Sequence, residues 1–532
     1  MRARVIEQLR HRARRRGQVT STERSVPDDR QSWMQAGAAP TWLRLAVVAL
    51  ASLVLGSWLF VALARIDDSF GTIGPWTGLA FYAANGVFYP PLFDGEHFAG
   101  TRYMPLQFLL YAGGSKVTGE YFVSGKIVVA LLTAGLLATL YVTLRRVGCS
   151  RAIAMGATAA TLATAPVLQA GTAIQGDSLA LLAQLVAIGA VARRPGHAST
   201  VLAGGLCAVA LLSKLTAVWA PVAIAIWLTA RFRPRAPLFV LSYAGSLLAG
   251  LTAIYVLSDG RLLENRSLVS TGTWPGIHDV GVGLPRLFAA MMMETAGAVW
   301  LLAPIALVGF IVAVRERSLT VYHISAPVAL VITLAILNDP GTAWNHLVDV
   351  SVLLTIVAAE IEPRASRAGF APPFVSVLLA TLVVGLATGY LAFMSPQLGG
   401  SVKGLSFGSA DPQFPTPPLA DYVSRDDTIL SEDASIAVAR DQIPVVLDAY
   451  MLLRILQERP EWRRALIRRI DAREFDKVVL LNQLDPTGQW YSRVHFGREV
   501  ATAIARNYRL ETRVGEYYWI YVRRLQAAHP TA

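Results

Sequence analysis

Long apolar runs recur along most of this chain, and Arg clusters separate many of them. A helix needs roughly twenty consecutive apolar residues to cross a bilayer, and residues 42–64 and 124–144 reach that length. With 54% hydrophobic and 16% charged residues, the chain of 532 residues is too apolar for a soluble globule and too long for one simple bundle. The pattern therefore predicts a polytopic α-helical membrane protein.

The Arg clusters predict how the runs are oriented. Arg145, Arg146 and Arg151 follow the second run, and positive residues concentrate in cytoplasmic loops. This alternation explains the net charge of +12 and excludes nucleic-acid binding. It gives about eleven spans, with the N-terminus inside and the C-terminus outside. The predicted spans are 42–64, 124–144, 152–170, 178–192, 201–213, 216–230, 237–257, 286–315, 321–337, 347–361 and 372–394.

The composition predicts four parts of the chain. Residues 1–41 are rich in Arg and read as a disordered cytoplasmic tail, and residues 42–394 form the transmembrane module. A polar linker, residues 395–411, leads to a second domain, residues 412–532. In that domain short apolar runs alternate with a helical pattern at 450–457, which predicts a small α/β domain on the outer face. Those apolar runs are 428–430, 445–447, 477–481 and 517–522.

Three acidic residues are candidates for catalysis. Asp67 and Asp68 follow the first span, and the predicted topology returns Asp177 to the same outer face. Carboxylates at a membrane boundary can act as bases, although the Asp67–Asp68 pair alone could simply end the helix at water. The convergence of two carboxylate sites on one face favours a functional interpretation.

Outer-face cations and polar side chains are candidates for binding phosphate and sugar. Arg suits bidentate phosphate binding and Lys acts as a point charge, although each could instead be an interface anchor. An outer-loop His can bind sugar hydroxyls or a divalent ion. Without HExxH or a compact His/Asp triad, we expect no obligatory metal and leave a divalent cation open. The candidates are Arg102, Tyr103, Lys214, Arg261, Arg266 and His346.

Together, these motifs resemble the GT-C superfamily of polyprenyl-phosphate-sugar-dependent glycosyltransferases, particularly protein O-mannosyltransferases and aminoarabinose transferases. The resemblance covers roughly the first four hundred residues. Asp67-Asp68 matches the family's acidic position after the first span, and Asp177 looks like its second-loop carboxylate. The stretch from Asp94-Gly95 to Arg102-Tyr103-Met104-Pro105-Leu106 is similar to a family motif, but the family's Lys-Pro-Pro-Leu is absent and Arg102 is displaced by one position.

The resemblance implies a GT-C fold with juxtamembrane helices in the first outer loop. It also implies transfer of a sugar, with inversion, from a polyprenyl-phosphate donor to an acceptor hydroxyl on the extracytoplasmic side of a bacterial inner membrane. Asp67 would be the base, Asp68 or Asp177 would orient it or the acceptor, and Arg102 or Lys214 would hold the phosphate. Lipid, protein and polysaccharide acceptors all stay open.

Two other functions compete with the transferase. A transporter or flippase of lipid-linked sugar also fits a polytopic bundle, although transporters usually carry mid-membrane charges and an internal repeat, neither of which is evident. A catalytically silent GT-C relative is the other alternative. In the C-terminal domain, Glu432-Asp433 and Asp448 lie at predicted strand ends, where we prefer helix capping to a role in ligand binding.

Overall fold

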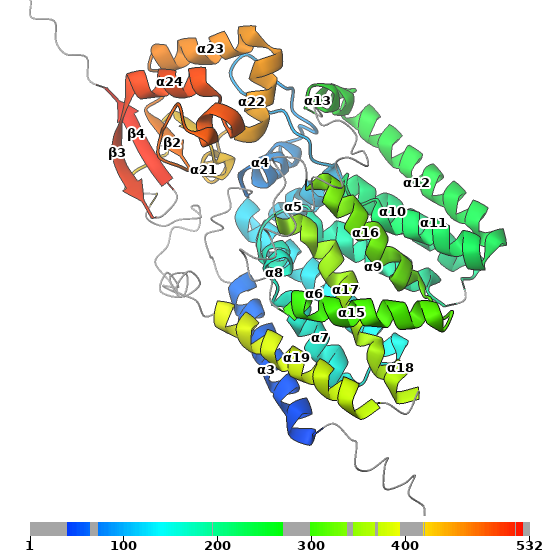
Figure 1. Ribbon diagram of the computed structural model, residues 1–532. Coiled ribbons are helices and arrows are strands. Elements are labelled where there is room, and N and C mark those ends of the chain that lie inside the picture. The colour runs from blue at the N-terminus through cyan, green and yellow to red at the C-terminus, as the bar shows by residue number, and fades with distance from the viewer. Residues whose placement is uncertain are drawn as a thin grey trace, which may run out of the picture.

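Helices make up most of the protein, and a small sheet lies near the C-terminus (Figure 1). The computed structural model describes residues 40–63, 73–193, 195–269, 298–337, 344–367, 371–393, 419, 421–515 and 518–524. The basic tail and the linker predicted at 395–411 therefore lie outside the described residues, apart from the last two positions of the tail.

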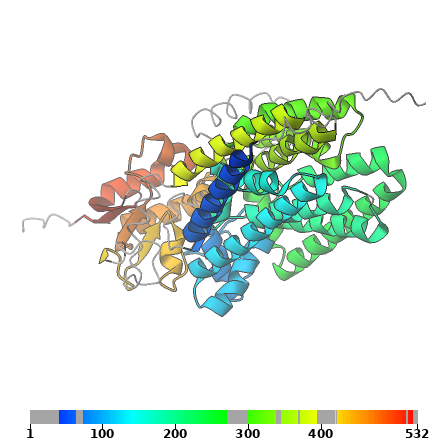
Figure 2. The ribbon, with the colours of Figure 1, turned by 90° about the horizontal axis from the view of Figure 1, so that it is seen from below.

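Each predicted span corresponds to a helix or a pair of helices. Their apolar side chains form one large core, in which α3 lies beside α19 (Figure 2). Glycine ends α6, since Gly148 adopts the left-handed φ of 108° that favours this residue. The helices of this bundle are α3 (Thr41–Leu63), α6 (Tyr121–Val147), α7 (Arg151–Leu162), α8 (Ala165–Thr172), α9 (Asp177–Val191), α10 (His197–Ser213), α11 (Trp219–Arg231), α12 (Ala236–Leu257), α15 (Ala298–Arg315), α16 (Val321–Ile336), α17 (Val348–Ala359), α18 (Ile361–Arg367) and α19 (Ala371–Phe393), with short turns η1 (Arg233–Arg235) and η2 (Trp344–Leu347).

The span predicted at 152–170 is broken in the middle. Helices α7 and α8 occupy this stretch and are bent by 77° at the break between them. Pro166 lies in the first turn of α8, where its missing N–H costs nothing, whereas inside a longer helix it would remove a backbone hydrogen bond.

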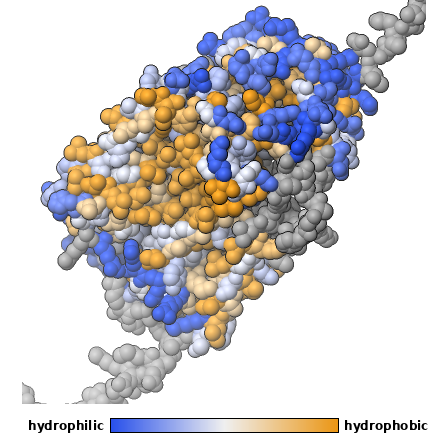
Figure 3. Space-filling view, turned by 180° about the vertical axis from the view of Figure 1, so that it is seen from behind, coloured by the Kyte–Doolittle hydropathy of each residue, from blue (hydrophilic) through white to orange (hydrophobic). Residues whose placement is uncertain are grey.

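By length and composition, three helices among the described residues could cross a membrane, or four if α7 and α8 count as one span. The three are Thr41–Phe60, Tyr121–Val147 and Arg233–Leu257, and six further apolar helices are shorter. Figure 3 shows a broad hydrophobic surface over the middle of the molecule, between hydrophilic ends. The apolar architecture is that of a membrane protein, and the count of eleven spans stays a prediction.

The first predicted outer loop contains two helices, α4 (Ile73–Ala84) and α5 (Pro105–Thr118), as expected for juxtamembrane helices. Helix α4 packs against the C-terminal region so closely that a Cβ atom on Gly74 would lie 2.7 Å from the Asp433 side chain. Leu447 and Ala434 share one hydrophobic core with residues of this loop. The loop is therefore held between the bundle and the C-terminal region.

The C-terminal region is an α/β unit with a four-stranded sheet in the order β1-β2-β4-β3. Strand β1 (Ile429–Ser431) is parallel to β2 (Lys477–Leu480), and β4 (Tyr518–Arg523) is antiparallel to β2 and to β3 (Tyr508–Val514). The predicted runs at 428–430, 477–481 and 517–522 match three of these strands. The unit's helices are α21 (Ala434–Val438), α22 (Ala449–Glu458), α23 (Pro460–Asp471) and α24 (Arg498–Asn507), and η4 (Trp490–Val494) is a π-helix.

Two details of this unit differ from the prediction. The run at 445–447 is not a strand of the sheet, because Val446 instead forms one isolated parallel bridge with Phe98 of the first outer loop. Strand β3 was missed. Only Tyr508 and Val514 at its two ends are buried, so its sequence lacks an apolar run.

Candidate active site

A buried acid–base pair joins the ends of two helices of the bundle. Asp177 is the first residue of α9 and only 3% exposed, and a helix N-terminus favours a carboxylate. Lys214 follows α10 in an extended conformation, and its Nζ forms a salt bridge with Asp177 Oδ1. The sequence analysis selected both residues, and the structure pairs them.

Aromatic residues of the first outer loop hold the turn before Asp177. Trp76 lies so close to Gly176 that a Cβ atom there would come within 2.5 Å of the indole. The Tyr111 hydroxyl donates to the Gln175 carbonyl over 2.7 Å and accepts from Gln107 Nε2. Glycine at position 176 is therefore required by packing against the indole.

Arg102 and Tyr103 lie where the first outer loop meets the C-terminal unit. The Tyr103 ring packs on Trp76 with 4.4 Å between centroids, and the Arg102 guanidinium lies 4.7 Å from the Tyr450 ring centroid. Burial raises the pKa of Tyr103 to about 12, with Asp448 adding to the effect and Arg102 opposing it. The phenol therefore stays protonated at neutral pH and can donate a hydrogen bond.

His346 and Asp349 approach the same pair from η2 and α17. Burial, with the charges of Lys214 and Arg102, holds the pKa of His346 well below its ordinary value, so the imidazole is neutral. Asp349 lies near enough to Lys214 and Asp177 to interact with both charges. The sequence analysis missed Asp349, although a carboxylate at the start of an apolar helix is itself a signal.

The C-terminal unit contributes Asp448 to this group of side chains. It caps α22 as expected, since its Oδ1 accepts from the N–H groups of Tyr450 and Met451 at 3.0 and 3.2 Å. Its Oδ2 is buried and has no hydrogen-bond partner in the part of the chain that the structure describes. Burial raises the pKa of this carboxyl, and the charge of Arg102 opposes the rise. Capping therefore accounts for only one of its two oxygens.

The structure brings together Arg102, Tyr103, Asp177, Lys214 and His346, but not every candidate. Arg261 is linked to them only through Tyr89: its guanidinium donates to the Tyr89 carbonyl over 3.3 Å, and the Tyr89 hydroxyl donates to the Tyr103 carbonyl.

Three other candidates cannot be placed. Asp67, Asp68 and the Arg266 side chain lie outside the described part of the chain.

No group of three His, Cys, Asp or Glu side chains within the described ranges could hold a metal ion. The positions of Asp67 and Asp68 are not among those ranges. What the described cluster offers instead is a set of cations and neutral donors suited to an anion such as phosphate.

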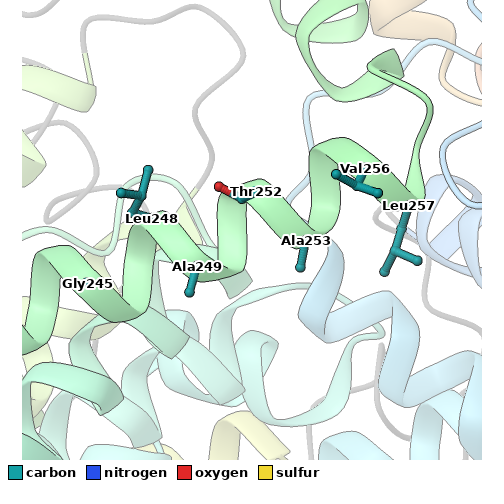
Figure 4. A pocket seen from close by; sticks show the side chains of 7 residues that line it. All are labelled: Gly245, Leu248, Ala249, Thr252, Ala253, Val256 and Leu257. Carbon is teal, nitrogen blue, oxygen red and sulfur yellow. The ribbon is translucent and has the colours of Figure 1, made fainter.

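An apolar groove of about 660 Å³ runs along α12 (Figure 4). Seven residues between Gly245 and Leu257 line it, and Thr252 is the only one of these with a polar side chain. Helix α12 leads into α13 (Arg261–Val269), which packs against α22 of the C-terminal unit. The groove therefore ends near the part of the molecule that carries Arg261.

No family model matches the sequence, and no curated protein matches it. Among solved structures, the fold is similar to that of ArnT from Cupriavidus metallidurans in two states. The apo structure has a TM-score of 0.59 and 13% identity, over 89% of this chain and 97% of that one. The structure bound to undecaprenyl phosphate has a TM-score of 0.55 and 14% identity, over 91% and 99%.

A more distant similarity is to the apo oligosaccharyltransferase of Archaeoglobus fulgidus. Its TM-score is 0.49 and its identity 10%, over 85% of this chain and 72% of that one. ArnT is a GT-C glycosyltransferase, and its similarity covers the bundle, the first outer loop and the C-terminal unit together. The chain described here therefore has the GT-C glycosyltransferase fold.

Proposed function

We propose that this protein is an integral-membrane glycosyltransferase of the GT-C type. It transfers a sugar from a polyprenyl-phosphate-linked donor to an acceptor hydroxyl, with inversion, on the extracytoplasmic side of a bacterial inner membrane. The observation that carries the proposal is the convergence of Arg102, Asp177, Lys214 and His346 at one end of an apolar bundle with the fold of ArnT.

The cluster supplies what departure of a phosphate needs. The acceptor oxygen attacks the anomeric carbon while the bond from that carbon to the phosphate oxygen breaks. Negative charge then grows on the leaving polyprenyl phosphate, which Arg102 or Lys214 stabilises. The protonated Tyr103 and neutral His346 can donate hydrogen bonds without adding charge.

Asp67 takes the proton of the acceptor hydroxyl in this proposal. Asp68 or Asp177 orients the base or the acceptor. The pairing of Asp177 with Lys214 supports a positioning role, because the carboxylate fixes the ammonium at the mouth of the bundle.

The apolar groove on α12 supports entry of the donor lipid from the side. Its lining suits a hydrocarbon chain, and helix α12, which carries it, leads into α13, where Arg261 lies. ArnT, with which this chain shares its fold, was solved with undecaprenyl phosphate bound.

The C-terminal unit, residues 412–532 in our division of the chain, presents or selects the acceptor. Its contact with Arg102 through Tyr450 supports this role. The sugar acceptor can be a lipid, a protein or a polysaccharide, and no obligatory metal takes part. A divalent cation is an additional component that this proposal does not require.

The transporter or flippase is not favoured, because the fold is similar to that of ArnT. A silent GT-C relative is also disfavoured, since the cation and carboxylate cluster is present.

The decisive experiment measures transfer of radiolabelled sugar from a panel of polyprenyl-phosphate sugars. Membranes carry either the wild-type chain or Asp67→Asn. We expect labelling of an endogenous acceptor from one donor, abolished in the variant at equal expression. Absence of transfer from every donor, with lipid-linked sugar crossing the membrane instead, would replace the transferase with the flippase.

A further inference from the structure

The C-terminal unit holds a buried carboxylate that is bonded to an imidazole, Glu432 with His495. Glu432 is fully buried, and its carboxylate accepts from His495 Nδ1 at 2.6 Å, Trp490 Nε1 at 3.0 Å and the Tyr491 hydroxyl at 3.0 Å. The Leu481 N–H donates to the same carboxylate. The bond to Glu432 fixes the imidazole through Nδ1, so Nε2 is the ring nitrogen that remains to bind another group.

The backbone around His495 is irregular in a way that sets its position. The π-helix Trp490–Val494 precedes it, and Phe496 follows with φ of 59°, an unfavourable conformation for an aromatic residue. The Trp490 ring packs on the imidazole with 4.4 Å between centroids. Such irregularities often occur at functional sites, so they direct attention to this imidazole.

Asp448 begins α22 and His495 follows η4, and these two elements pack against each other, so the charges of the two side chains interact. The backbone just before Asp448 is hydrogen-bonded to the first outer loop. The Phe98 N–H donates to the Val445 carbonyl, and the Leu447 N–H donates to the Phe98 carbonyl, both over 2.8 Å. These bonds hold Asp448 at a fixed place relative to Arg102 and Tyr103, four and five residues after Phe98.

One oxygen of Asp448 is therefore a buried acceptor that no described residue bonds. Its side chain is 7% exposed, and leaving such an atom unbonded is costly. The other buried cap of this unit differs, because Asp433 uses both oxygens, one with Ser435 and one with the Tyr518 hydroxyl at 2.8 Å. A bound molecule that donates a hydrogen bond would satisfy Asp448 in the same way.

We propose that Asp448 and His495 form a carbohydrate subsite that binds hydroxyl groups of a sugar next to Arg102 and Tyr103. A carboxylate oxygen and an imidazole nitrogen both accept from hydroxyls, and nearby aromatic rings present apolar faces to the sugar ring. The sugar belongs to the donor or to a glycan acceptor. This inference rests on the proposed function, which it deepens by giving the C-terminal unit a binding role.

The test compares two isosteric variants in the full-length chain. In Asp448→Asn, the amide oxygen can still cap α22, but a donor replaces the free acceptor. Asp433→Asn is the matched control, because it changes a buried cap whose oxygens both have protein partners. Asp448→Ser, which caps the helix but is too short to supply a second oxygen, guards against misfolding of the first variant.

Binding is measured separately from activity, by titrating purified protein with a polyprenyl-phosphate sugar and with polyprenyl phosphate alone. Acceptor KM is measured in the transfer assay. We expect Asp448→Asn and Asp448→Ser to lose about tenfold in affinity for the sugar-bearing lipid but none for the lipid phosphate. A tenfold rise in acceptor KM alone would assign the subsite to the acceptor and also support it.

Unchanged donor affinity and unchanged acceptor KM in both Asp448 variants would overturn the subsite, as would equal losses in Asp433→Asn. If the wild-type protein shows no transfer, but the Asp448 variants still lose affinity for the sugar-bearing lipid selectively, the subsite stands. That result would remove only the transferase function.

Discussion

Charged clusters lie at both ends of α17, and they differ in how their members are bonded. At its end, Arg364 binds Glu360 at 3.0 Å, Glu316 at 3.3 Å and Ser318 Oγ at 2.6 Å. These contacts attach the turn that follows α15 to helix α18. At its start, Asp349 lies among side chains from several separate elements.

The difference separates a structural cluster from the one that we propose to be functional. In the cluster around Arg364 the guanidinium is bonded to Glu360, Glu316 and Ser318, so it holds helices together, although the buried His323 Nε2 next to Glu360 has no hydrogen-bond partner among the described residues. The cluster around Lys214 gathers Arg102, His346 and Asp448 from the outer loop, η2 and the C-terminal unit, and one Asp448 oxygen in it has no hydrogen-bond partner within the described ranges. Polar capacity that the protein does not use itself is available to a substrate.

The largest effect should come from the proposed base. Asp67→Asn should lower the transfer rate by about 10²–10⁴-fold, the usual contribution of general base catalysis, with an unchanged thermal midpoint. Glu96→Gln, in the same outer loop, is the control, because the Glu96 side chain is exposed. Full activity of Asp67→Asn would remove this assignment.

Arg364→Met should show the opposite pattern, which is a loss of stability without a loss of activity. Removing one partner of a buried ion pair leaves the other charge uncompensated, which costs about 3–5 kcal/mol of unfolding free energy. Transfer per folded molecule should stay normal. Denaturation in detergent measures the loss, with the exposed Arg315→Met as control. A stable but inactive Arg364→Met variant would mean that the Arg364 cluster also serves activity, which would contradict the comparison.

Lys214→Met should combine both effects. It removes a phosphate-stabilising cation, for a loss of about 10²-fold in rate, and it strands the buried Asp177. Adding Asp177→Asn should restore the thermal midpoint without restoring transfer. The exposed Lys116→Met should change neither quantity. Recovery of activity in the double variant would show that the pair is structural.

Gly176→Ala should affect the turn before Asp177. The new methyl group meets the Trp76 indole, so we expect destabilisation of about 1–3 kcal/mol and slower transfer. The control is Gly189→Ala in the same helix α9, where nothing lies within 4 Å and alanine should stabilise slightly. Equal midpoints for the two variants would contradict the packing argument.

The smallest effect concerns His346. Its pKa is depressed in the folded state, so the unfolded state binds the extra proton first, and stability should fall as the pH drops below about 6.5. Above that pH the group contributes nothing to this dependence. Thermal midpoints at several pH values should show a flatter profile for His346→Gln. An unchanged profile would mean that the imidazole titrates normally.

Much of the architecture was predictable from sequence because apolar runs and Arg clusters are local signals. They located α3, α6 and α12 to within a few residues, and the topology alone grouped Arg102, Asp177, Lys214 and His346 on one face. The break between α7 and α8 was not predicted, although Pro166 marks it.

The sequence by itself determined the apolar helices, their order and the end of the bundle at which polar residues gather, because each depends on composition over a few turns. Only the tertiary structure decided which polar atoms have partners. The run at 445–447 looks like a strand of the sheet, yet its backbone bonds Phe98. Asp448 looks like a helix cap, yet one of its oxygens, within reach of the Arg102 charge, has no hydrogen-bond partner among the described residues. Both outcomes depend on contacts between residues more than three hundred positions apart in the chain, which no local pattern encodes.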